Sequence, residues 1–136
     1  MPQPQRQSTM TSQGTAHGRF QRAIRDRLLR RATTAARELG DVSLADALAL
    51  TLLTAEAGDD RWPRAAARWL GRFIVESPAI TIGEAGLAAA AVHELVAGIG
   101  GRELAAETLR QLAATHGHAT VAALLESRSW TPSAVG

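Results

Sequence analysis

Helix-capping signals recur along this chain at intervals that leave room only for short helices. Ser43 and Thr81 are each followed three residues later by an acid, Asp46 and Glu84, which is the pattern of a capping box at a helix start. Glycines follow the apolar periodic stretches and are typical helix stops, namely Gly40, Gly58 and Gly117. The sequence therefore predicts an all-α single domain of five or six helices packed as antiparallel hairpins.

Apolar periodicity between these signals sets the expected helix boundaries. We expect helices at about 19–39, 44–57, 60–77, 82–97, 103–116 and 120–128. The helix at 82–97 is so rich in Ala that we expect neighbours packed closely around it. Residues 1–18 are polar and lack an apolar face, so they are predicted to be a disordered tail. Residues 129–136 are predicted to be a flexible C-terminal tail, which leaves 19–128 as the helical domain.

The two capping boxes also raise the question of an internal repeat. Thr81 follows Ser43 after 38 residues, and the same shift places Glu84 on Asp46. One interpretation is a short stack of helical hairpins, related to the HEAT or tetratricopeptide solenoids. The other is an irregular bundle in which two similar helices happen to start alike.

Composition excludes several classes of function. The chain of 136 residues has no Cys, so disulfides, thiolate catalysis and cysteine-ligated metals are excluded. Its longest apolar stretch, AGLAAAAV at 85–92, is too short to cross a membrane. These features predict a soluble, cytoplasmic protein. An Arg-rich, acid-poor N-terminus is also typical of an organellar transit peptide, although no cleavage site is evident.

Charge is distributed unevenly along the chain. Residues 1–40 hold eight of the 15 arginines against Asp26 and Glu38, a net charge of +6. The remainder holds seven arginines against eleven acids, a net charge of −4. A basic N-terminal piece joined to an acidic body indicates a polyanion, an acidic partner, or docking of the piece onto the body itself.

Residues with catalytic or metal-binding chemistry do not form a recognised motif. His93-Glu94 begins like the zinc-protease HExxH, but residue 97 is Ala where the second ligand is required. His116 and His118 flank a glycine and are interpreted as part of a turn. The glycines at 98–101 lack the Lys-Ser/Thr of a phosphate-binding loop. We therefore expect no enzyme activity, no catalytic residues, no cofactor and no metal site.

A segment at 109–128 has some features of a DNA-binding helix-turn-helix. Its turn is too short, however, and its second helix offers mainly apolar side chains where base-reading Arg, Asn or Gln would be needed. Ordinary packing of two helices across a break explains this segment better.

The expected helix at 60–77 carries a candidate partner-binding surface. Its arginines recur at spacings of three and four, with the tryptophans toward the other side, and the candidate residues are Arg61, Trp62, Arg64, Arg68, Trp69 and Arg72. The alternative is that the tryptophans anchor the core while the arginines face water.

The helix expected at 19–39 carries a second candidate surface. Its apolar stripe consists of Phe20, Ile24, Leu28, Ala32, Ala35 and Leu39. The candidate nucleic-acid-binding residues are the arginines around it, namely Arg19, Arg22, Arg25, Arg27, Arg30 and Arg31. Since this chain uses Arg for every basic position and has no Lys, each arginine is weaker evidence of phosphate recognition than usual.

The phrases SLADALALTLL and RAAARWLGRFIVESPAITIGEAGLAAAAVHEL, within residues 43–95, resemble a set of small uncharacterised all-helical proteins of high-GC actinobacteria. The resemblance implies a bacterial origin and a helical fold, and the family has no assigned activity.

Two functions are consistent with these patterns, and a third, a small enzyme, would require a cavity in which His93 and acidic side chains converge. The first is a non-enzymatic protein-protein interaction or adaptor module that docks a protein partner through the Trp/Arg helix. The alternative is a nucleic-acid-associated accessory protein that contacts phosphate through its Arg-rich first helix. The sequence also leaves a homo-oligomer open.

Overall fold

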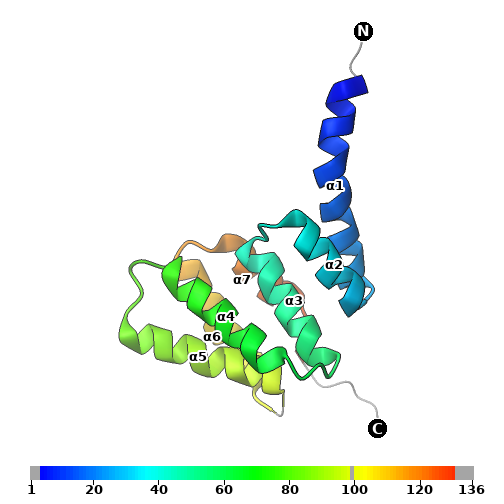
Figure 1. Cartoon of the computed structure of the whole chain (residues 1–136). Coiled ribbons are helices and arrows are strands. Elements are labelled where there is room, and N and C mark those ends of the chain that lie inside the picture. The colour runs from blue at the N-terminus through cyan, green and yellow to red at the C-terminus, as the bar shows by residue number, and fades with distance from the viewer. Residues whose placement is uncertain (1–3, 99, 131–136) are drawn as a thin grey trace.

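The computed structural model describes residues 4–98 and 100–130, and this part of the chain is all-α with seven helices (Figure 1). The helices are α1 (Pro4–Arg25), α2 (Leu29–Leu39), α3 (Leu44–Glu56), α4 (Trp62–Val75), α5 (Ile82–Ala97), α6 (Arg102–Thr115) and α7 (Ala119–Ser127). The last five agree with the predicted helices to within about two residues at each end. The prediction of five or six helices was too low, because the segment predicted as one helix at 19–39 forms two of the seven.

The segment predicted as one helix at 19–39 is two helices that fold back on each other. Helix α1 ends at Arg25, α2 begins at Leu29, and the two pack side by side. A straight helix of this length would span about 32 Å, longer than α3, and would leave part of its apolar stripe in water. Folding back buries Phe20, Ala32 and Ala35 within the hairpin instead.

The break between α1 and α2 is a helix-ending motif with Arg27 in the left-handed conformation, at φ 58°. The Arg27 N–H donates to the carbonyl of Ile24 at 3.1 Å, and the Leu28 N–H donates to that of Ala23 at 2.8 Å. The left-handed conformation costs a non-glycine residue about 1–2 kcal/mol. Complete burial of Phe20 contributes about 1.5–3 kcal/mol, which is enough to offset that cost.

Helix α1 also begins earlier than predicted, at Pro4, within the segment expected to be a disordered tail. Its N-terminal half extends away from the other helices (Figure 1). Ala16 is already buried, so the packed part of the chain starts before residue 19. Once these packed residues fix a helical turn, adding further turns toward the N-terminus costs little, because nucleation is the unfavourable step. Residues 1–3 lie outside the described residues.

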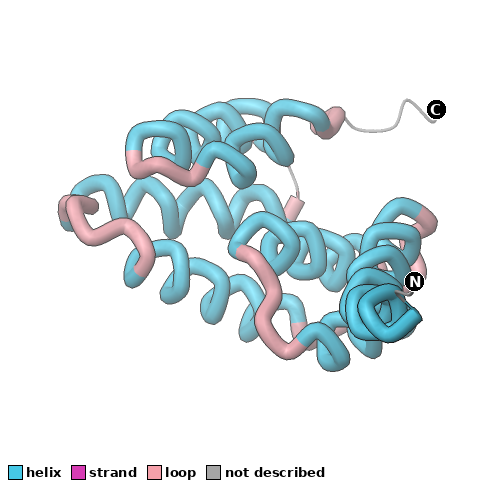
Figure 2. Tube along the Cα trace, turned by 90° about the horizontal axis from the view of Figure 1, so that it is seen from above, coloured by secondary structure: helices cyan, strands magenta, loops and turns pink. Residues whose placement is uncertain are grey.

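Helix α3 lies between two apolar clusters. Leu48 and Leu52 belong to the main cluster with helices α4 to α7, whereas Leu50 and Leu53 contact the smaller cluster inside the α1–α2 hairpin. This arrangement explains why α3 is apolar on nearly every face. Seen from above, the hairpin stands at one end of the body, with α1 viewed almost along its axis (Figure 2).

Both predicted capping signals are used. The Ser43 hydroxyl accepts from the Asp46 N–H at 3.1 Å at the start of α3. Thr81 and Glu84 form the complete reciprocal box at the start of α5. The carboxylate of Asp46 does not return to its own cap and instead accepts from Gln21 of α1 at 3.1 Å.

Helix α3 contacts α1, α2, α4, α5 and α7. In a solenoid each hairpin contacts only its neighbours along the stack. The contact between α3 and α7 closes the helices into a bundle around α3, so the 38-residue interval marks two similar hairpins, α3–α4 and α5–α6, within that bundle.

The expectation that α5 is surrounded was wrong. One face, with Ala88, Val92 and Leu95, is buried against its neighbours, but Ile82 is 93% exposed and Leu87 is 55% exposed. The alanines therefore pack against neighbours on one side of α5 only, where their small size permits close approach of α4 and α6.

The expectation of a flexible tail from residue 129 was wrong at Trp130. Its side chain is buried in the main cluster, and its indole N–H donates to the carbonyl of Leu125 at 3.0 Å. Arg102 and Arg128 place their guanidinium groups against the ring, with Cζ atoms 5.3 Å and 5.2 Å from its centroid. Residues 131–136 lie outside the described residues.

Candidate functional site

Four of the six candidate arginines of the N-terminal segment come together in one hollow of the α1–α2 hairpin. Its volume is about 540 Å³, and its lining consists of Arg19, Arg22, Ala23, Asp26, Leu28, Arg30, Arg31 and Thr34. We call it the hairpin hollow. It exists only because the chain folds back at Arg27, so a single predicted helix could not reveal it.

The two helices give the hollow a lining with both basic and apolar side chains. Helix α1 contributes Arg19 and Arg22, and α2 contributes Arg30 and Arg31. Between them lie Ala23, which is buried, and Leu28, a large aliphatic residue that is 40% exposed. Thr34 also lines the hollow, and its hydroxyl donates to the carbonyl of Arg30 at 3.0 Å.

Arg19 is engaged inside the hairpin. Its two terminal nitrogens donate to the two carboxylate oxygens of Glu38 at 3.0 Å and 2.6 Å. These hydrogen bonds raise the pKa of Arg19 and lower the pKa of Glu38. Both side chains are more than 40% exposed, so solvent screening makes this a weak contribution to stability. Its structural effect is to hold α2 against α1.

The other three arginines of the hollow differ from Arg19. Within the described part of the chain, Arg22, Arg30 and Arg31 form no ion pair with an acid. The one acid in the hollow, Asp26, lies 3.9 Å from the Nε atom of Arg25, at the long limit for an ion pair. The hollow therefore presents three guanidinium groups that form no ion pair with a described acid, together with one carboxylate, that of Asp26.

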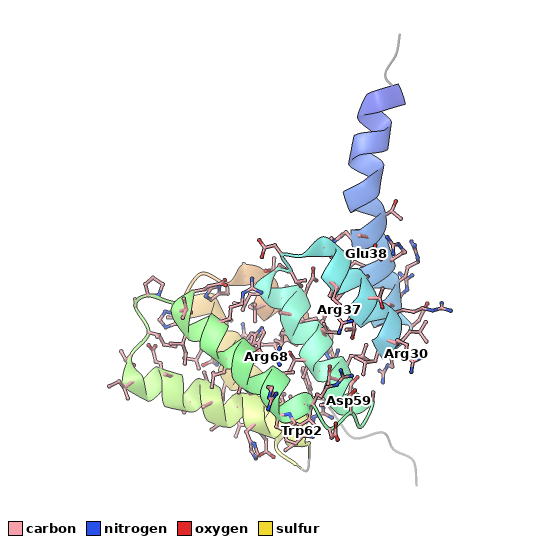
Figure 3. The ribbon with its side chains drawn as sticks, viewed as in Figure 1. Arg30, Arg37, Glu38, Asp59, Trp62 and Arg68 are labelled. Carbon is pink, nitrogen blue, oxygen red and sulfur yellow. The ribbon has the colours of Figure 1, made fainter. Side chains whose placement is uncertain are left out.

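The hairpin docks onto the body through apolar contacts. Leu53 of α3 packs into the hairpin cluster, and Gln21 donates to Asp46. Among the described residues, the one ion pair between hairpin and body joins Arg27 to Glu56 at 3.9 Å. The acidic body therefore leaves most of the positive charge of the hairpin unneutralised. Arg30 lies on the hairpin at the opposite side of the molecule from α5 (Figure 3).

The candidate surface on α4 is divided between core and solvent. Trp69 is 2% exposed, its indole N–H donates to the carbonyl of Leu44 at 2.8 Å, and its ring stacks on Phe73 with centroids 5.3 Å apart. It anchors α4 to α3 and is not available at the surface. Trp62 is half-buried at the other end of α4, close to Asp59 (Figure 3).

The arginines of the predicted stripe along α4 are of two kinds, paired and unpaired. Arg61 donates two side-chain hydrogen bonds and its N–H to Asp59, which lowers the pKa of that carboxyl group to about 2. Arg72 donates to Glu76 at 2.6 Å. Arg64 and Arg68 are exposed, and no described acid pairs with them. The predicted stripe thus offers two of its four arginines to a partner.

An apolar groove lies between α4 and α5. Trp62, Pro63 and Leu70 line it from α4, and Ala89, Val92 and His93 line it from α5. His93 is exposed at its edge. The predicted partner-binding helix therefore has a hollow beside Trp62, but Trp69 is not part of it.

The two histidines of the 116–118 turn have separate structural partners. His116 Nε2 lies 3.2 Å from a carboxylate oxygen of Glu84, and His118 Nε2 lies 2.9 Å from the Ser77 hydroxyl. The pKa of Glu84 is lowered, first by the backbone N–H of Thr81 and then by His116. These contacts fasten the α6–α7 turn onto the connection between α4 and α5.

The pair of Ser77 and His118 is not a catalytic site. Ser77 is fully buried, and its hydroxyl donates to the carbonyl of Phe73 at 2.7 Å, so it cannot reach a substrate. Within the described residues, no group of three or more His, Asp or Glu side chains could hold a metal ion. In the same part of the chain, no helix has both the length and the apolarity to cross a membrane.

Helix α7, which would be the recognition helix of a helix-turn-helix, turns its apolar side chains inward. Val121, Ala122 and Leu125 are buried in the main cluster. Packing across the 116–118 turn therefore accounts for the 109–128 pattern.

Comparison with known proteins gives no relative for this chain: no protein family, curated protein or solved structure matches it.

Proposed function

We propose that this protein is a non-enzymatic binding module that contacts the phosphate backbone of nucleic acid through the α1–α2 hairpin. The observation that carries this proposal is the convergence of Arg22, Arg30 and Arg31 on one hollow, where none of them forms an ion pair with a described acid. Guanidinium groups donate paired hydrogen bonds that match phosphate oxygens, and they remain charged at every physiological pH. A cytoplasmic location is part of the same proposal.

The state of the other arginines supports this choice. Arg19 and Arg61 are held by Glu38 and Asp59, so they are already used within the chain. The hairpin keeps its positive charge because, among the described residues, only Arg27 forms an ion pair with an acid of the body. A surface of unpaired arginines attracts a polyanion over a Debye length of about 10 Å, and phosphate binding gains further from counterion release.

A fluorescently labelled oligonucleotide tests the proposal by anisotropy at several salt concentrations. The double variant Arg30→Ala, Arg31→Ala should weaken binding and flatten the slope of log K against log [salt] by about 1.4–1.8, at roughly 0.7–0.9 for each of two lost phosphate contacts. The matched control is Arg64→Ala, Arg68→Ala, which removes the same charge from exposed, unpaired arginines of α4. Equal losses in the two variants would mean that net charge alone drives binding, and the hairpin proposal would then fail.

A protein partner is the second candidate function, and the groove beside Trp62 favours it. Half-buried Trp62 lines an apolar groove next to α5, and the unpaired Arg64 lies on the same helix. Tryptophan and arginine are frequent energetic centres of protein interfaces. Affinity purification from the native host, with and without nuclease, tests this candidate. A single partner that survives nuclease treatment and is lost in Trp62→Ala would support it.

A further inference from the structure

The shape of the hairpin hollow bears on which form of nucleic acid it can accept. The arginines line a concave space between two helices that pack directly on each other through Ala23, Ala32 and Ala35. A DNA duplex is stiff over about 150 base pairs and presents a convex backbone. A duplex can lie across the hollow but cannot enter it. A single strand is flexible enough to place one nucleotide inside.

The lining of the hollow offers an apolar contact. Leu28 is 40% exposed, although it belongs to the apolar stripe of the sequence. The hydrogen bond from its N–H to the Ala23 carbonyl fixes its position at the end of α1. A volume of about 540 Å³ is within the range of small-ligand sites. A nucleobase in the hollow would cover Leu28 while its phosphate meets the arginines of the lining.

Asp26 gives the hollow one carboxylate, which accepts hydrogen bonds and cannot donate them. Its carboxylate is 58% exposed and has only a distant contact, at 3.9 Å, with Arg25. Among the bases, adenine, cytosine and guanine carry an exocyclic amino donor, whereas thymine and uracil carry carbonyl acceptors there. A carboxylate therefore favours the amino-bearing bases and repels the carbonyl of thymine.

We propose that the hairpin hollow takes one nucleotide of a single strand, with its phosphate on Arg22, Arg30 and Arg31, its base on Leu28, and its exocyclic amino group on Asp26. This inference rests on the proposed function, which requires phosphate contact alone. It adds a preference for single strands and for amino-bearing bases.

Anisotropy with labelled dC15, labelled dT15 and a 15-base-pair duplex at pH 7.5 tests the inference. Cytosine and thymine are both pyrimidines, so the comparison isolates the exocyclic group. We expect dC15 to bind about tenfold more tightly than dT15, the lower end of the effect of one hydrogen bond to a charged group. The duplex should bind more weakly than dC15. Leu28→Ala should reduce the advantage of the single strand over the duplex.

Asp26→Asn is the decisive variant. An amide donates as well as accepts, so it can pair with thymine too, and the preference for dC15 should fall below about twofold. Asp41→Asn is the matched control, because it removes the same charge from an exposed residue that does not line the hollow. It should retain the preference.

The outcomes separate the two proposals. If none of the three oligonucleotides binds, both the proposed function and this inference fail. If all three bind with equal affinity, phosphate contact stands and the nucleotide in the hollow is ruled out. A preference for dC15 that persists in Asp26→Asn rules out the assigned role of Asp26.

Discussion

Arg27 Nη1 lies 3.9 Å from Glu56 Oε1, and this contact joins the turn of the basic hairpin to the last residue of α3. The same carboxylate binds Arg128 near the C-terminal end of the described chain. Arg27 is 73% exposed, and so long a contact at the surface contributes little energy. The backbone of Arg27 contributes more to the fold than its charge does. Its left-handed conformation forms the turn that follows α1.

Arg27→Gly should stabilise the protein by about 0.5–1 kcal/mol. Glycine adopts the left-handed conformation without the steric cost that Arg27 pays at φ 58°. The lost ion pair with Glu56 is exposed and offsets this gain only slightly. Urea denaturation at neutral pH measures the difference. Arg25→Gly, inside the last turn of α1, is the control and should destabilise by about 0.5–1 kcal/mol. A less stable Arg27→Gly variant would contradict the turn geometry.

Trp69→Ala should destabilise the protein by about 3–5 kcal/mol, whereas Trp62→Ala should cost clearly less. Trp69 is 2% exposed, stacks on Phe73 and donates to the Leu44 carbonyl. Trp62 is half-buried at a groove and loses less packing. Chemical denaturation of the two variants gives the comparison. Similar costs for both would show that α4 packs differently, and would return Trp69 to the list of candidate surface residues.

Periodicity and caps predicted the body of the fold well. Ser43 and Thr81 start helices as expected because the capping hydrogen bonds are local, formed within three residues of the sequence. Local sequence signals did not predict the break between α1 and α2 at Arg27. Nothing in the 19–39 segment marks a helix end, since arginine is not a preferred residue there and no glycine is present. Tertiary burial of Phe20 decides the break, and that contact depends on α3.

The candidate site could also be predicted from the sequence only in part. The sequence predicted a basic surface in the N-terminal segment, because eight arginines among its first 40 residues are visible without a structure. Which of them remain unpaired was not visible. Arg19 and Glu38 are 19 residues apart and meet only because the hairpin folds back. The grouping of Arg22 with Arg31 around Leu28 arises from the same turn.

Acidification should destabilise the protein as the pH falls from about 4 toward 2. The pKa values of Asp59 and Glu107 are both lowered to about 2, chiefly by hydrogen bonds from Arg61 and Arg110. In the unfolded chain these groups titrate near 4. The unfolded state therefore binds protons first, so the stabilisation is complete above about pH 4 and is lost as the pH falls through 2. Thermal unfolding between pH 7 and pH 2 measures this loss.

The double variant Asp59→Asn, Glu107→Gln isolates the contribution of these two carboxyl groups. It should be less stable than the original chain at pH 7 and should lose less stability on acidification, because the two groups no longer titrate. Parallel pH profiles for the variant and the original chain would mean that other carboxyl groups cause the acid sensitivity.

Trp130→Ala should destabilise the protein by about 3–5 kcal/mol, the cost typical of a buried aromatic residue. The Nε atoms of Arg102 and Arg128 are buried without a hydrogen-bond partner, and both guanidinium groups lie against the Trp130 ring. Removing the ring leaves these cations with neither a π face nor that packing contact. Trp130→Phe keeps an aromatic face but loses the hydrogen bond to Leu125, so it should cost less than the alanine variant. Guanidinium denaturation followed by circular dichroism measures both variants. A Trp130→Ala variant within about 0.5 kcal/mol of the original chain, the range of ordinary surface substitutions, would show that this residue does not hold the C-terminal segment against α6.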